Sequence, residues 1–345
     1  MELKVKTYNP NLIVEEIGKA LNTKTKKGYI EEVIHLPNDV GEGRILGFKF
    51  SDGVGLLLID CTFKQKIKFE FDESLLSPLL FSFTSLGSLT HISNYGNNHS
   101  LLSPFQSTIS ANPLGSSNVF IFPPNEKVVF SCIVIDRQKF KKKIDAGFGN
   151  ISEKVKSIFL DTNSEKPFFY QTNYSMSSSI HLQEVIDNEI MDFTRSVYLE
   201  GITLELLSSQ INQFKNSIAN NLRKQTLLSN DDIAKILEVK EILLKNLQDT
   251  PTIESLSKKI GVNQTKLKIG FKSIFDIPII TWLRHKRLEN AQLLLLKDNK
   301  SIKEISEFVG YSNQSHFSKQ FRSRYGVLPK DYLKQIKKKR TLDSE

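Results

Sequence analysis

The stretch SIKEISEFVGYSNQSHFSKQFRSRYGV (301–327) repeats the plan of an earlier one, TIESLSKKIGVNQTKLKIGFKSIFDI (252–277). Gly261 corresponds to Gly310 at an offset of 49, and Phe271 corresponds to Phe321 at an offset of 50. Within each copy the apolar residues recur three and four positions apart, which places them on one side of a helix. The glycine between the apolar runs suits the left-handed conformation in which a helix ends. Each copy is therefore predicted to form a helix, a turn and a second helix.

The second helix of each copy is predicted to bury one side and expose the other. The inward positions are Leu267, Phe271 and Phe275 in the first copy and Phe317, Phe321 and Tyr325 in the second. The outward positions are Thr265, Lys268, Ile269 and Lys272 in the first copy and Gln314, Ser315, Ser318, Lys319 and Arg322 in the second. Neither outward side carries a carboxylate, as nearness to phosphates requires, and such side chains bond base edges in the major groove. We predict that these nine residues contact DNA.

Between the copies lies IITWLRHKRLENAQLLLLKDN (279–299), whose apolar residues predict a single helix. A helix of about 17 residues is roughly 25 Å long. Such a strut suits two recognition helices placed about one DNA turn, or roughly 34 Å, apart. Its basic residues Arg284, Lys286 and Arg287 either pack or touch phosphate, and the sequence favours neither reading. We include Arg284 among the predicted DNA contacts.

The positive charge of the chain is concentrated at one end. The formal net charge is +9, yet residues 251–340 hold 20 Lys and Arg against 7 Asp and Glu, whereas residues 1–250 hold 27 against 29. A basic surplus confined to one end indicates a polyanionic partner there, either nucleic acid or an anionic membrane surface. No apolar run approaches the length of about 18 residues that spans a membrane, and the first residues lack a signal-peptide core. A cytoplasmic protein without a membrane partner is therefore expected.

In the preceding part of the chain, the pattern of apolar residues changes near residue 180 from one typical of strands to one typical of helices. From about 44 to 145, short apolar or alternating runs such as VGLLLIDCTF (54–63) and EKVVFSCIVIDRQKF (126–140) predict a small antiparallel sandwich or barrel. Beyond it, Gly201 is expected to bend or break a helix whose apolar stripe packs on the β domain or pairs with a second subunit. That stripe comprises Leu182, Ile186, Ile190, Phe193, Val197, Leu204, Leu207, Ile211 and Phe214.

This pattern predicts an α+β chain of several domains. Residues 1–150 form a β-rich sensor, 151–230 a helical dimerisation segment with a polar linker over 215–230, and 231–340 an all-α DNA-binding domain. A new helix is expected to start at Asp231, where two acidic residues complement the helix dipole.

The second copy and its extension, IKEISEFVGYSNQSHFSKQFRSRYGVLPKDYLK (302–334), resemble the signature of the AraC/XylS family of transcriptional regulators. The glycine followed by an aromatic residue, the phenylalanines four residues apart, the Tyr-Gly pair and the later proline carry the resemblance, which covers about 231–338. It implies two helix-turn-helix units joined by a rigid linker helix, with base contacts from the outward sides. It also implies a cupin-like N-terminal region that binds a small ligand and controls a dimer.

Two details refine the resemblance. The family often has Arg or Trp in the first recognition helix, where this chain has Thr265, Lys268 and Ile269, so its preferred site should differ. The stretch NQTKLKIGFKSIF (263–275) is similar to the pyochelin-type regulators of siderophore uptake. The expected function is sequence-specific regulation of transcription, as an activator. The expected partners are double-stranded DNA, a second copy of the chain, RNA polymerase and a small-molecule effector.

Other functional classes find less support in the sequence. No catalytic motif occurs, and His35, His91 and His99 are scattered, so we expect no enzyme activity, metal or cofactor. An alkyl-transfer repair enzyme would need Cys61 or Cys132 as acceptor, and neither lies in an active-site or zinc motif. A sequence-indifferent architectural protein is a further alternative, against which Gln314 and Ser318 offer base-reading capacity. The many phenylalanines form either a plain core or a ligand pocket.

Overall fold

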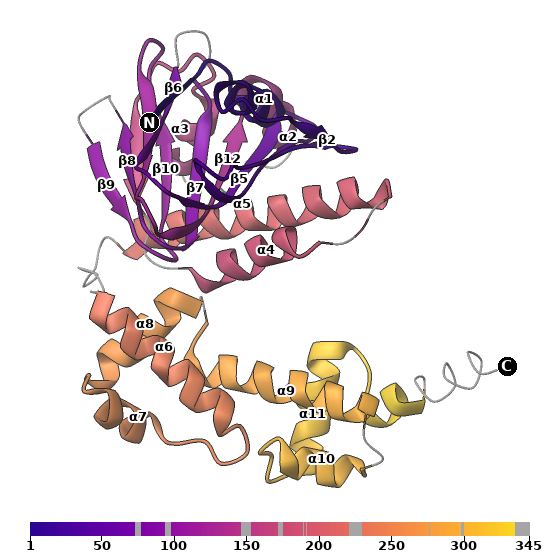
Figure 1. Ribbon diagram of the computed structural model, residues 1–345. Coiled ribbons are helices and arrows are strands. Elements are labelled where there is room, and N and C mark those ends of the chain that lie inside the picture. The colour runs from indigo at the N-terminus through magenta and orange to yellow at the C-terminus, as the bar shows by residue number, and fades with distance from the viewer. Residues whose placement is uncertain are drawn as a thin grey trace, which may run out of the picture. The chain divides into compact units, whose positions relative to one another are not determined.

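The computed structural model describes residues 1–72, 77–93, 98–145, 153–171, 175–188, 190, 192–220, 230–275, 277–297 and 300–334. Figure 1 shows two compact units, Met1–Leu227 and Leu228–Glu345. The first is rich in β-strands and the second is all-α, which confirms the coarse fold expected from the sequence. The finer division of the chain into three parts stays a prediction.

The strands of the first unit form two open sheets. The smaller sheet has the order β1 (Glu2–Val5), β6 (Ile67–Asp72), β11 (Ser117–Phe122), β8 (Leu89–Ser93) and β9 (Asn98–Leu102). The larger has the order β13 (Phe168–Gln171), β10 (Ser107–Ala111), β7 (Leu79–Leu86), β12 (Lys127–Ile135), β5 (Val54–Phe63), β4 (Gly41–Lys49), β3 (Glu31–His35) and β2 (Lys26–Lys27). Pairing is antiparallel except between β1 and β6, which run parallel.

One hydrophobic core fills the space between the two sheets. Helix α1 (Pro10–Ala20) packs on β3 and β4 and contributes Ile13, Val14 and Ile17 to this core. The sequence reading missed this helix, although Asn9 caps it by accepting a hydrogen bond from the Asn11 N–H, and a proline opens its first turn.

The phenylalanine-rich part of this core is tightly packed. The cavity that remains there has a volume of about 10 Å³, room for about one water molecule at most. These residues therefore form a plain core rather than a ligand pocket. They are Leu57, Ile59, Phe69, Phe71, Phe120, Phe122, Phe130 and Cys132.

A second core covers the other face of the larger sheet. Helices α2 (Arg137–Asp145), α3 (Glu153–Leu160), α4 (Met176–Ile186) and α5 (Thr194–Asn220) belong to this layer. Strands β5 and β12 are buried on both faces as a result, which explains why their sequences are nearly continuous apolar runs. Leu182, Leu206 and Phe214 pack from α4 and α5 onto this face.

The helical segment differs from its prediction in two respects. The chain reverses between α4 and α5, where Asp187 ends the first helix, and Gly201 lies inside the uninterrupted α5. Because the helical phase restarts at Thr194, Phe193 and Val197 do not join the buried stripe and are each 65% exposed. The end of α4 is held to the larger sheet, since Arg44 of β4 donates to the Ile186 carbonyl at 3.1 Å. The polar linker expected over 215–230 falls mostly outside the described residues.

A buried polar cluster joins the two sheets of the first unit. His91 of β8 is fully buried, with Nε2 2.8 Å from Asn118 Oδ1 and Nδ1 3.0 Å from Thr108 Oγ1. Its ring stacks on Phe120 at 4.3 Å. A neutral imidazole satisfies both contacts, because Nε2 then donates to the amide oxygen while Nδ1 accepts from the hydroxyl. Burial lowers the pKa of His91 to about 4.

The second unit consists of helices. They are α6 (Asn230–Lys245), α7 (Ile253–Ile260), α8 (Gln264–Phe275), α9 (Ile279–Lys297), α10 (Ile302–Phe308) and α11 (Gln314–Tyr325). Helix α9 extends from the pair α7/α8 to the pair α10/α11, and its 19 residues measure about 28 Å (Figure 1). Within the described residues, no helix of either unit is both long and apolar enough to cross a membrane.

The neutral state of His91 predicts that acid destabilises the first unit. Unfolded His91 takes up a proton near its ordinary pKa of about 6.5, whereas folded His91 does so only near 4. Stability is therefore lost as the pH falls from about 6.5 to about 4, by about 3 kcal/mol. Denaturant-dependent hydrogen exchange of β8 and β11 at pH 7 and pH 4.5 measures this loss.

The matched variants are His91→Gln, which cannot titrate, and His35→Gln, which removes an exposed histidine. His91→Gln should lose less stability between the two pH values, while His35→Gln should follow the unmodified chain. Equal acid sensitivity of all three proteins would contradict the assignment of the proton to His91.

Candidate nucleic-acid interface

The first helix pair is delimited by local signals. Thr252 caps α7 by accepting a hydrogen bond from the Ser255 N–H at 3.1 Å, and Gly261 ends the helix with φ +67°. At the start of α8, the Asn263 side-chain oxygen accepts from the Lys266 N–H at 2.7 Å. The predicted glycine stop is present and Asn263 caps the next helix, so the turn between α7 and α8 follows from its own residues.

Helix α8 buries the side that the sequence assigns to the core. Leu267 and Phe271 are fully buried, and Phe271 and Phe275 each lie 5.7 Å from the Trp282 ring of α9. Burial of this side leaves the opposite one in solvent. The exposed residues there are Thr265, Lys268, Ile269 and Lys272.

The second helix pair is capped even more completely. Ser301 and Glu304 form a reciprocal capping box at the start of α10, and Gly310, with φ +88°, reverses the chain after it. Ser312 and Asn313 both precede α11 with side chains that can cap a helix, and Asn313 takes this role. Its side-chain oxygen accepts from two backbone N–H groups of the first helical turn, at 2.8 and 3.0 Å.

Helix α11 turns its polar side toward a shallow surface groove of about 510 Å³. Phe317 and Phe321 are fully buried on the opposite side, whereas Tyr325 is half-buried. The groove brings together all five outward residues predicted for the second copy and adds Leu328, which the sequence reading did not include. Its lining is Gln314, Ser315, Ser318, Lys319, Arg322 and Leu328.

The three basic residues of α9 have different surroundings. Arg284 is exposed, which leaves it available to a phosphate. Lys286 pairs with Glu289 at 2.7 Å and lies over the Trp282 ring. Arg287 is half-buried and packs inside the unit, so it is not a free cation. The sequence left open whether these basic residues pack or touch phosphate, and Arg287 packs.

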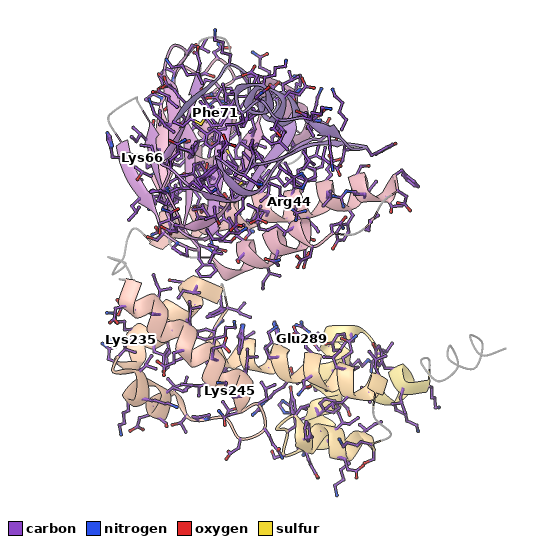
Figure 2. All side chains as sticks on the ribbon, in the orientation of Figure 1. Arg44, Lys66, Phe71, Lys235, Lys245 and Glu289 are labelled. Carbon is purple, nitrogen blue, oxygen red and sulfur yellow. The ribbon has the colours of Figure 1, made fainter. Side chains whose placement is uncertain are left out.

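The one carboxylate of α9 is paired on both sides. Glu289, labelled in Figure 2, also accepts from the Arg324 guanidinium of α11 at 2.8 Å. Its negative charge is therefore balanced by two cations before any phosphate approaches. Burial, together with the nearby Arg324 and Arg284 charges, lowers the pKa of His285, so this imidazole adds no cation to the helix at neutral pH.

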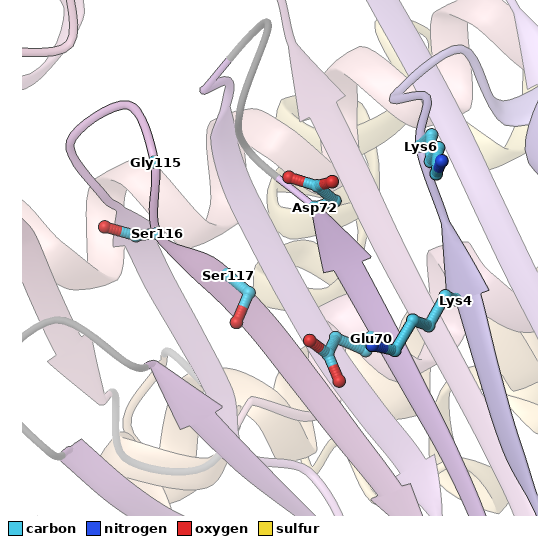
Figure 3. Close-up of a pocket in the computed structure, with 7 residues that line it drawn as sticks. All are labelled: Lys4, Lys6, Glu70, Asp72, Gly115, Ser116 and Ser117. Carbon is cyan, nitrogen blue, oxygen red and sulfur yellow. The ribbon is translucent and has the colours of Figure 1, made fainter.

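The first unit carries a separate polar pocket of about 410 Å³ (Figure 3). It lies on the smaller sheet, where Lys4 reaches toward Glu70 and Lys6 lies beyond Asp72. Two lysines and two carboxylates balance each other, so the pocket presents no net charge to a polyanion. Gly115, Ser116 and Ser117 complete its lining.

The cysteines are poorly suited to nucleophilic chemistry. Cys61 and Cys132 are both buried, and burial raises the pKa of each thiol, that of Cys132 to about 12. A protonated thiol without solvent access is a weak nucleophile, so the alkyl-transfer alternative gains no support. Among the described residues, no three His, Cys, Asp or Glu side chains gather in a way that could hold a metal ion.

Comparisons with known proteins match part of the second unit to a known domain. Residues 256–335 match the model of a helix-turn-helix domain. The Msm operon regulatory protein of Streptococcus mutans is 23% identical over 65% of this chain and 77% of its own length. Regulatory protein PchR of Pseudomonas aeruginosa is 30% identical over 32% of this chain and 36% of its own length. Several other curated relatives are likewise matched over only about a third of their length.

Solved structures also match this chain, at low sequence identity and low TM-score. A ToxT variant from Vibrio cholerae, in its apo form, is 13% identical and covers 84% of this chain and 99% of its own, with a TM-score of 0.34. A transcriptional regulator with an AraC-type DNA-binding domain from Chromobacterium violaceum is 24% identical, covers 30% of this chain and 92% of its own, and has a TM-score of 0.29.

The interface predicts two kinds of mutational effect. Gln314→Ala or Lys268→Ala should cost about 1–3 kcal/mol of binding free energy and relax base preference at one position of the site. Arg284→Ala should weaken binding to every sequence by a similar factor and reduce the salt slope by about 1. Titration of labelled duplexes with single-base changes, at several salt concentrations, separates the two effects.

Lys245→Ala is the matched control, since this exposed lysine ends α6 and lies on neither outward side. An unchanged base preference in Gln314→Ala would show that α11 does not read bases through the groove.

Proposed function

We propose that this chain, whose C-terminal unit is an AraC-type helix-turn-helix domain, is a sequence-specific DNA-binding regulator of transcription. The matches bear out the family resemblance found in the sequence. The single observation that carries the proposal is the α11 groove, where polar and basic side chains gather above a buried aromatic core. Helix faces of this kind fit the major groove of B-DNA.

Both helix pairs act as helix-turn-helix units in this proposal. Helices α8 and α11 are the recognition helices, and each exposes basic residues with no carboxylate on the same side. Lys268 and Lys272 supply positive charge in the first helix pair, and Lys319 and Arg322 supply it in the second helix pair. Neutralised phosphates provide affinity, whereas residues such as Gln314 provide discrimination between bases.

The first unit senses a signal and controls the second in this proposal. Its cupin-like character is part of this proposal and comes from the resemblance; in support, its strands form two open sheets, and it folds around its own cores. The regulator acts in the cytoplasm, as an activator that works with RNA polymerase and answers a small-molecule effector. The alternatives of an alkyl-transfer enzyme and an architectural protein are less favoured, because the thiols are buried and base-reading side chains line the groove.

Dimerisation is proposed to use an apolar surface on α4 and α5. Val197 and Tyr198 are 65% and 42% exposed on α5, and Ile180 is 53% exposed on α4. Ile180, Ile190 and Tyr198 line one groove of about 590 Å³, whose lining also includes Gln183, Glu184, Asp187 and Asn188. Large apolar side chains gathered on a surface mark an interaction site. A second copy is the partner that suits a DNA-binding protein, because a two-fold pair reads two copies of one site.

The regulatory function is tested by binding to the DNA upstream of the protein's own gene. Specific affinity should exceed affinity for random duplex of the same length by at least about a thousandfold at physiological salt. Fluorescence anisotropy over a range of salt concentrations measures both constants. Equal affinity for all duplexes would indicate an architectural protein and contradict the proposal.

Replacing Val197 with Glu should dissociate the dimer, because a carboxylate in an apolar interface loses its hydration without gaining a partner. Light scattering coupled to gel filtration should give the dimer mass for the unmodified chain and the monomer mass for the variant. Leu114→Glu is the control, since Leu114 is also an exposed apolar residue, at 53%, but lies between β10 and β11. A dimer that survives Val197→Glu would place the interface elsewhere.

A further inference from the structure

Arg287 of α9 contacts at once the turn that precedes the first helix pair and the turn inside the second pair. Its Nε donates to the Leu247 carbonyl at 2.8 Å, and its Nη2 donates to Thr250 Oγ1 at 3.0 Å and to the Gln248 carbonyl at 3.4 Å. These acceptors belong to the turn that leads from α6 into α7, at the edge of the first pair. The same guanidinium lies over the Tyr311 ring, 6.0 Å from its centroid, in the turn between α10 and α11.

The two turns also approach each other directly. Gly310 has φ +88°, and a Cβ built on it would lie 2.6 Å from Arg287 Nη2 and 2.7 Å from the Gln248 carbonyl oxygen. Both distances are shorter than real Cβ atoms tolerate. The glycine is therefore required for two reasons: the left-handed backbone of the turn, and the close fit of the second pair against the first.

Tyr311 transmits this contact to the recognition helix. It is 7% exposed, and its ring packs edge-on against Phe317 of α11 at 5.4 Å. Phe317 belongs to the buried stripe that sets the rotation of α11. Within the described residues the Tyr311 hydroxyl has no hydrogen-bond partner, so the ring alone makes the contact.

Other contacts between α9 and the helix pairs, in the part of the chain that the structure describes, are local to one pair. Trp282 packs on Phe271 and Phe275 at one end of α9, and Leu288 and Leu295 belong to the core of the second pair at the other. Such contacts hold each pair on the strut separately. The contacts of Arg287 and Gly310 instead connect the first pair to the second.

We propose that Arg287 is a positioning residue that sets the separation and relative rotation of the two helix-turn-helix units, and so selects the spacing between the two DNA boxes they read. This inference rests on the proposed function. Insertion of one base pair moves a box by about 3.4 Å along the duplex and rotates it about the axis. We call Arg287, with its contacts to residues 247–250 and 310–311, the Arg287 clamp. Two helix-turn-helix units held by this clamp can fit only one spacing between the DNA boxes.

Arginine is suited to this position in a way that lysine is not. The planar guanidinium presents several N–H donors in a fixed fork and stacks on an aromatic face at the same time, whereas an ammonium is a point charge. Arg287→Lys should therefore keep the charge and lose the clamp. Arg287→Met should lose both and keep most of the apolar packing of the side chain.

The experiment uses the full-length protein and duplexes that carry the two boxes of one site with the spacer shortened or lengthened by one or two base pairs. A further probe carries one box alone. The unmodified chain should lose affinity about tenfold for a one-base-pair change, because simultaneous engagement of both boxes is lost. Arg287→Lys and Arg287→Met should bind all spacers with affinities within about threefold of one another, and the single-box probe as the unmodified chain does.

Companion variants distinguish the clamp from a general loss of stability. Tyr311→Phe keeps the ring and should retain the spacing preference, whereas Tyr311→Leu should weaken it. Lys245→Met removes an exposed charge of the same unit and should leave the profile unchanged. Circular dichroism and melting curves establish that each variant is folded.

The outcomes separate the clamp from the proposed function. Equal loss of affinity at every spacing and on the single box would mean that Arg287 only stabilises the fold, and an unaltered profile would mean that it positions nothing; either result overturns the inference. Specific binding by the unmodified chain with no spacing preference also overturns it. Failure of the unmodified chain to prefer its own site over random DNA would instead overturn the proposed function.

Discussion

A helix can offer a defined polar side to a ligand only when the opposite side is held in a core. In α11 this constraint is met by Phe317 and Phe321, both fully buried against α9 and α10. In α8 it is met by Leu267 and Phe271. Burying an aromatic side chain stabilises the fold by about 1.5–3 kcal/mol. An exposed lysine side chain, by contrast, can change its orientation at little cost in free energy. The aromatic stripes therefore set the phase of each helix, and the polar residues take the positions that remain.

The first unit depends on a different constraint, which is that its larger sheet is covered on both faces. Its larger sheet is covered on one face by the smaller sheet and α1, and on the other by α2 to α5. Central strands must then be apolar on both faces, and the few buried polar groups must find partners inside. His91 does so with Thr108 and Asn118 across the two sheets. A tightly packed interior of this kind transmits small displacements, because close-packed cores do not deform continuously.

Several predictions held because they depended on neighbours in sequence. The glycine stops and the inward phenylalanines of both copies were predicted from the sequence and are confirmed, since each depends on residues within one or two helical turns. The outward residues followed from them by exclusion, and the structure leaves these side chains exposed or half-exposed. Their contacts with DNA stay a prediction. The stripe across α4 and α5 was misread, because periodicity alone could not show that the chain reverses before Phe193.

The strand-rich first part, the two repeated helix pairs, the phase of α8 and α11 and the basic charge of the last hundred residues could all be predicted from the sequence. These features arise from local periodicity, capping and composition, which need no knowledge of distant contacts. The packing of Arg287, the exposure of Arg284 and the close approach of Gly310 to the Gln248 carbonyl become visible only in the folded chain. The partners in these contacts lie roughly 40 to 60 residues apart, so their proximity depends on how whole helices pack, and no short pattern of residues encodes it.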